Sequence, residues 1–158
     1  MLQATGQRLA QGIICGHWAL ALSFDWARHI VERFELSAVP KSPHWLLGSA
    51  NVDGTIVPVV DLGLYFGTSA GAAPAGLQRR LLVGGLAGQD SDEAMALVFT
   101  GLPQQLKYLP APLSYAGALP ARLRDVCQGI ARDASGRDFL EINTQTLKAI
   151  LADELSLR

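Results

Sequence analysis

Residues 51–62 have the sequence Asn51-Val52-Asp53-Gly54-Thr55-Ile56-Val57-Pro58-Val59-Val60-Asp61-Leu62. Their Asp-Gly dipeptide readily adopts the positive φ angles of a tight hairpin turn. The run from Thr55 to Val60 is nearly all β-branched and apolar, which predicts a strand buried on both faces. Pro58 has no N–H to donate, so its nitrogen must face away from a ladder partner. Asp61 is placed to cap a short helix over 62–66, so the stretch predicts a turn, a strand and a helix in succession.

The composition is that of a globular chain of one-domain size. Of its 158 residues, 49% are hydrophobic and 17% are charged, which excludes an intrinsically disordered protein. The net charge is −1 and no segment concentrates Lys or Arg, so neither nucleic acid nor a charged membrane surface is an expected partner. No apolar run approaches the ~20 residues that cross a bilayer. We therefore expect a single cytoplasmic domain over 1–158, without direct membrane insertion.

The turn–strand–cap pattern occurs twice in the sequence. Gly54 is followed seven residues later by Asp61, and Gly136 is followed seven residues later by Asn143. Each of these two polar residues is suited to cap the helix that follows. The second helix, predicted over 143–155, is the longer one. Both halves of the chain therefore predict several strands followed by a helix.

A weaker internal similarity relates two apolar tetrapeptides. Ala21-Leu22-Ser23-Phe24 resembles Ala96-Leu97-Val98-Phe99. This similarity predicts that Phe24 and Phe99 occupy equivalent core positions in the two halves.

The predicted fold class is mainly β, with two small β-barrel subdomains, short helices and a C-terminal helix. Short apolar strands punctuated by Gly and Pro favour small barrels over a sandwich. The expected subdomains cover 13–67 and 80–155, joined by an Ala-, Gly- and Pro-containing linker over 68–79. Exchange of strands between the barrels across this boundary stays open.

Other segments give more local predictions. Residues 1–12 are polar and are expected to be frayed, whereas 13–15 and 18–24 are expected to be strands. Residues 25–30 suit a short helix or an irregular strand. Residues 102–120 contain four prolines, which predicts extended or turn structure.

No catalytic, metal or cofactor site is indicated. Asp61 after an apolar strand faintly resembles the catalytic turn of aspartic proteases, but Leu62 lacks the hydroxyl group that such a turn needs, so the capping role is favoured. The three histidines have no metal-ligand spacing, and the two cysteines lie far apart, at 15 and 127. The sequence therefore predicts a protein that is not an enzyme and binds no cofactor.

Three motifs give the chain a family resemblance. Residues 51–62 resemble the signature Asn-Leu-Arg-Gly-x-x-x-Pro-[Val/Ile]-Val-Asp-Leu of CheW-like coupling proteins. Residues 21–30, Ala-Leu-Ser-Phe-Asp-Trp-Ala-Arg-His-Ile, resemble the family's Ala-Leu-Pro-Ile-x-x-Val-x-Glu-Ile. Residues 128–147 resemble its closing pattern of a glycine, a hairpin, an Asp or Asn, and a helix. Together the resemblance covers roughly 13–155.

The resemblance implies two five-stranded barrels and a non-catalytic adaptor function. Such proteins couple the cytoplasmic tip of a chemoreceptor (methyl-accepting protein) to the regulatory domain of a CheA-type histidine kinase, in chemotaxis or type IV pilus chemosensory signalling. The implied partner-binding residues are Ala27, Arg28, Ile30, Asn51, Asp53 and Gly54.

Two departures from the family pattern change a charge. Asp53 stands where the family has arginine, and His29 stands where it has glutamate. The reversed charge at the hairpin turn predicts a divergent receptor or kinase with a compensating cation.

A second functional class is a β-barrel that binds a small molecule. Barrel mouths hold ligands, and Trp18, Trp26 and Trp45 are candidates to line one. Placement of these tryptophans in the core or between the subdomains would favour the adaptor instead.

Overall fold

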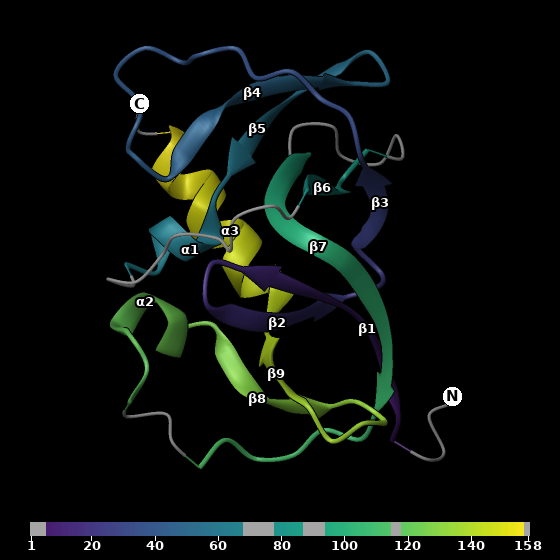
Figure 1. Cartoon of the computed structure of the whole chain (residues 1–158). Helices are drawn as coiled ribbons and strands as arrows, with labels where there is room; N and C mark the ends of the chain where they lie inside the picture. Colours follow the sequence, from purple (N-terminus) through teal and green to yellow (C-terminus); the bar gives the residue numbers. More distant parts are fainter. Residues whose placement is uncertain (1–5, 68–77, 87–93, 115–117, 157–158) are drawn as a thin grey trace.

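The computed structural model describes residues 6–67, 78–86, 94–114 and 118–156. These ranges contain nine strands and three helices (Figure 1). In chain order they are β1 (Arg8–Cys15), β2 (Trp18–Ser23), β3 (Ala27–Val31), β4 (Leu46–Val52), β5 (Thr55–Val60), α1 (Leu62–Tyr65), β6 (Arg79–Gly84), β7 (Met95–Tyr108), α2 (Ala121–Arg124), β8 (Cys127–Arg132), β9 (Asp138–Ile142) and α3 (Thr144–Ser156). The mainly β class with short helices and a C-terminal helix is confirmed.

The long strand β7 connects the two ends of the molecule. Its first half pairs with β6 and β5, and its second half pairs with β1. In Figure 1 it runs from the side of the β4–β5 hairpin toward the β8–β9 hairpin at the opposite end. The remaining strands therefore fall into two groups that share β7.

The first strand group contains β3, β6, the first half of β7, β5 and β4, paired in that order. The chain that leaves β3 returns to β4, where Ser37 and Ser49 exchange two backbone hydrogen bonds of 2.8 Å each.

The second strand group contains the second half of β7, β1, β2, β9 and β8, again in pairing order. Here the chain that leaves β7 meets β8, because the backbones of Ala111 and Ile130 bond to each other reciprocally at 2.8 and 3.1 Å.

Three apolar clusters match this organisation. One lies among strands of the first group and includes Val57, Leu81 and Val98. Another lies among strands of the second group and includes Leu106 and Phe139. The largest, called the central cluster below, joins residues of both groups to α1, α2 and α3; it includes Ile13, Leu22, Trp45, Leu97, Phe99, Leu123 and Leu147.

Both predicted helix caps are confirmed. The Asp61 carboxylate accepts a hydrogen bond from the backbone N–H of Leu64 at 3.1 Å, at the start of α1. The Asn143 amide oxygen accepts one from Thr146 N–H at 3.1 Å, at the start of α3. Each bond satisfies a donor that would have no partner within its helix.

The structure corrects the prediction for one strand and decides between the alternatives for another. β1 begins at Arg8, so residues 8–12 are ordered by pairing with β2 and β7 rather than frayed. Residues 102–108 form the end of β7, so the extended alternative holds for this part of 102–120. Pro103 is tolerated there because the ladder with β1 is irregular between Thr100 and Gln104, so no N–H is needed at that point.

Other boundaries also shift. For residues 25–30 the irregular-strand alternative is the better one. β3 spans Ala27–Val31, and its pairing with β6 shifts register between Ala27 and His29. The helix α2 was not predicted. Most of the predicted linker, 68–77, lies outside the described residues, as does the acidic segment 87–93, which the sequence predicts to be a loop. β6 already begins at Arg79, within the predicted linker.

The predicted equivalence of Phe24 and Phe99 is wrong. Phe99 is 1% exposed within β7, whereas Phe24 is only half-buried and lies just beyond the end of β2. The internal similarity holds better for the preceding residues. Ala21 pairs in parallel with Glu141, and Ala96 pairs in parallel with Val59, so each apolar tetrapeptide aligns with the hairpin strand of the opposite half.

Within the described ranges, no helix combines the length and the apolar character required to span a membrane.

Candidate partner-binding surface

The fold brings the two N-terminal family motifs together. His29, on β3, lies with its Nε2 atom 3.5 Å from Oδ2 of Asp53, at the tip of the β4–β5 hairpin. Their side chains are 47% and 77% exposed, respectively. The two residues whose charge differs from the family pattern are therefore neighbours on an accessible surface.

The backbone of the hairpin tip explains the roles of three predicted residues, Asn51, Asp53 and Gly54. Asp53 has φ +52° and Gly54 has φ +89°, as in a type I′ turn, which only Gly, Asn and Asp adopt readily. The Asn51 amide oxygen accepts a hydrogen bond of 2.8 Å from Gly54 N–H. Asn51 and Gly54 thus shape the turn, which leaves the Asp53 carboxylate as its exposed charge.

The three predicted residues on β3 have different environments. Ala27 is fully buried in the central cluster, so its side chain has no surface to offer a partner. Ile30 is half-buried and packs against the same cluster. Arg28 is exposed, and its Nε donates to the Phe24 carbonyl at 3.1 Å.

The exposure of Ile56 was not predicted, because the apolar run 55–60 is typical of a strand that is buried on both faces. In the structure it is 64% exposed, and it pairs with Asn51 across the hairpin. Residues that face each other in a ladder project on the same side of the sheet. The outer face of this hairpin therefore carries an uncovered branched side chain.

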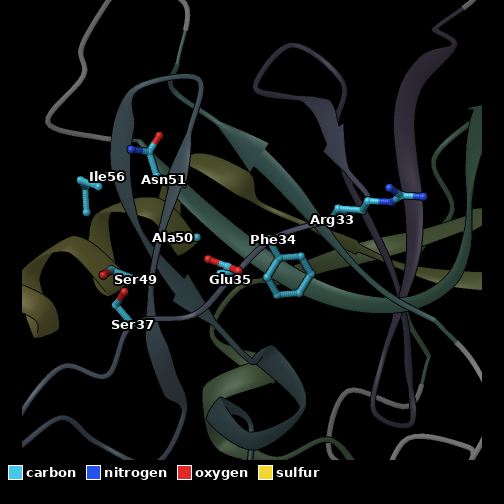
Figure 2. Close-up of a pocket in the computed structure, with 8 residues that line it drawn as sticks. All are labelled: Arg33, Phe34, Glu35, Ser37, Ser49, Ala50, Asn51 and Ile56. Atoms are coloured by element: carbon cyan, nitrogen blue, oxygen red, sulfur yellow. The ribbon is translucent and has the colours of Figure 1, made fainter.

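A hollow of about 450 Å³ lies beside this hairpin, between β4 and the chain that follows β3. Figure 2 shows its lining residues, which are Arg33, Phe34, Glu35, Ser37, Ser49, Ala50, Asn51 and Ile56. The hollow combines charged, polar and apolar side chains.

The three tryptophans lie around the central cluster. Trp45 is 2% exposed and packs edge-on against Tyr65, with ring centroids 5.0 Å apart. Trp18 and Trp26 are partly buried against the same cluster. None of the three lines the 450 Å³ hollow, so these side chains contribute to packing among the strands and helices.

The remaining reactive side chains have structural surroundings. Cys15 is buried, and burial raises the pKa of its thiol, so the nucleophilic thiolate is disfavoured at neutral pH. Asp61 is occupied as a helix cap. Among the described residues, His, Cys, Asp and Glu side chains form no group of three that could hold a metal ion.

Known proteins that this chain resembles include a chemotaxis protein and a scaffolding protein of known structure. The chain is 39% identical over 51 residues to chemotaxis protein CheW of Thermotoga maritima, an alignment that covers 32% of this chain and only 34% of that protein. The fold is similar to the crystal structure of the scaffolding protein TtCheW from Thermoanaerobacter tengcongensis. That match has a TM-score of 0.64 and 16% sequence identity, and it covers 85% of this chain and 88% of the other.

The family assignment rests on a longer match. The family model described as the CheW-like domain matches residues 13–150, which include all nine strands except the start of β1, and most of α3. Both motifs that meet at His29 and Asp53 lie inside this range. The chain belongs to the CheW-like domain family.

Proposed function

We propose that this protein is a non-catalytic cytoplasmic adaptor that couples a chemoreceptor to a CheA-type histidine kinase in chemosensory signalling. The observation that supports it most directly is the contact between His29 and Asp53, which joins two family motifs into one accessible surface. The partners inferred are the kinase regulatory domain and the cytoplasmic tip of the receptor.

The two strand groups are proposed to be the two five-stranded barrels of such adaptors. In each group the chain that continues beyond the first strand forms a bridge to the last strand, through Ser37–Ser49 in the first group and Ala111–Ile130 in the second. Such a bridge closes each strand group in part. Each group also has its own apolar cluster.

The predicted sequence halves, 13–67 and 80–155, are proposed to exchange strands rather than to form one barrel each. The parallel pairing of β2 with β9, and of β5 with β7, supports this arrangement because each pair joins one half to the other.

The partner-binding surface is proposed to centre on Arg28, His29 and Asp53, three of the exposed charged or ionisable side chains of the two motifs. Because Asp53 stands where the family has a cation, the partner is expected to present a Lys or Arg there. Charges at the rim of an interface mainly select partners and set association rates.

Replacement of Asp53 by Asn is expected to weaken the cognate complex by roughly 1–3 kcal/mol. Asn adopts the positive φ of this position readily, so Asp53→Asn removes the charge without distorting the turn. The free energy of unfolding should stay within about 0.5 kcal/mol of the parent. The measurement is calorimetric titration with the regulatory domain and the receptor fragment encoded nearest to the gene.

His29→Gln is the matched variant for this experiment, because it removes the internal partner of Asp53 but keeps its carboxylate free for a cation. We expect His29→Gln to retain more affinity than Asp53→Asn. Unchanged affinity of Asp53→Asn for both proteins would place Asp53 outside the interface.

Salt is expected to have only a modest effect on affinity for the regulatory domain. The low proportion of charged residues, 17%, and the exposed apolar side chain of Ile56 favour an apolar contact surface. Contacts of that kind are insensitive to ionic screening. Titration at low and high salt measures this, and a steep loss of affinity would show that electrostatic attraction dominates instead.

A further inference from the structure

We propose that the edge of β4 at Asn51 is a strand-addition site, which takes an extended segment of a partner protein. This inference rests on the proposed function, since it assigns one mode of contact to the adaptor's partners. The site is the hollow of about 450 Å³ shown in Figure 2.

The hollow begins where the chain that follows β3 stops pairing with β4. Ser37 and Ser49 exchange two backbone hydrogen bonds at its closed end. This close approach depends on Gly48, because a β-carbon there would lie 2.5 Å from the Ser37 carbonyl oxygen. In an antiparallel ladder the next such pair would be Glu35 with Asn51. Among the described residues no bridge joins these two, and both line the hollow instead.

The geometry of the hairpin directs backbone groups of Asn51 toward this space. Val52 and Thr55 close the two-residue turn, and such a closing pair is hydrogen-bonded. Hydrogen-bonded and non-hydrogen-bonded pairs then alternate, so the N–H and C=O of Asn51 face away from Ile56. The same alternation places Pro58 where no N–H is required, and it turns the Ser49 groups outward to bond with Ser37.

The side chains around this edge suit an extended peptide. Half-buried Phe34 and the 64% exposed Ile56 offer apolar contacts at the hollow, while the exposed Arg33 and Glu35 provide one charge of each sign. A bound segment must place an amide donor and a carbonyl acceptor opposite the backbone C=O and N–H of Asn51, with an apolar side chain beside them. An extended chain added to a sheet edge does this.

The first test compares two lysine substitutions at exposed strand residues. Ile56→Lys places a charge at the hollow, a device by which natural sheet edges resist strand addition. Leu102→Lys makes the same change at a residue that is 76% exposed and does not line the hollow. Against the kinase regulatory domain and the receptor fragment, Ile56→Lys should raise the Kd of at least one complex about tenfold. Leu102→Lys should leave that Kd within about twofold.

The second test follows backbone amides by NMR hydrogen exchange in the full chain. The Asn51 amide should exchange rapidly in the free protein and become protected in the complex. The Ala50 amide, which faces Val57 in the hairpin ladder, should be protected in both states and serves as the internal control.

The outcomes separate the possibilities. Binding with no protection of Asn51 and no effect of Ile56→Lys would overturn the strand-addition site but leave the adaptor function standing. Protection of Asn51 that grows with the concentration of the protein alone would assign the edge to a second copy of this chain and overturn the proposal. Failure of both proteins to bind would remove the proposed function and this inference with it.

Discussion

Phe99→Ala is expected to lower the free energy of unfolding by about 3–5 kcal/mol, the cost of removing a large buried aromatic side chain. Phe99 is 1% exposed and belongs to the central cluster, which joins both strand groups to the helices. A cavity at this place affects all of these elements together. The loss should therefore appear as a single cooperative transition at lower denaturant concentration, measured by circular dichroism.

Phe24→Ala is the matched control for this experiment. Phe24 is half-buried beyond the end of β2, so the same chemical change should cost less than about 2 kcal/mol. Equal losses for the two variants would contradict the different environments of the two phenylalanines.

Glu141→Ala is expected to destabilise the fold by about 3 kcal/mol, because it removes the acceptor of a buried network. The Glu141 side chain is 4% exposed, and its Oε2 accepts hydrogen bonds from Arg8 Nη1 at 2.7 Å and from the Tyr108 hydroxyl group. Burial raises the pKa of Tyr108, and the bond to Glu141 raises the pKa of Arg8. Both donors are thus held in their protonated forms.

Urea unfolding of a single variant and a double variant checks this expectation. Glu141→Ala leaves the Tyr108 hydroxyl without its acceptor, whereas Tyr108→Phe combined with Glu141→Leu removes both polar groups. The double variant should recover part of the stability that Glu141→Ala loses. Arg8→Met should cost less than about 1 kcal/mol, since the Arg8 side chain is 49% exposed. A loss as large as that of Glu141→Ala would show that the ion pair, rather than the buried hydroxyl contact, carries the stabilisation.

The features that the sequence predicts well are local ones. The Asp53-Gly54 turn, the strand over 55–60 and the caps at Asp61 and Asn143 each depend on residues close together in the chain. Backbone preferences and capping chemistry determine such elements directly. The family motifs also indicated the hairpin and β3 as the candidate surface.

The features that could not be predicted from the sequence depend on pairing between distant segments. Residues 102–108 contain Pro103 and little β-branched sequence, yet β1 holds them in a strand. The exposure of Ile56 depends on which face of the hairpin remains uncovered. The contact of His29 with Asp53, and the burial of Glu141 beside Tyr108, need registers that no local pattern specifies.

The pairing of β2 with β9 also determines when this protein can fold during synthesis. Leu20 pairs with Leu140, so β2 remains without its second neighbour until β9, at Asp138–Ile142, has left the ribosome. Ile13, Leu20 and Leu22, all fully buried in the finished protein, cannot complete their packing before then. Such distant pairing slows folding and leaves apolar strands open to aggregation. The nascent adaptor is therefore expected to depend on chaperones until its last strand is made.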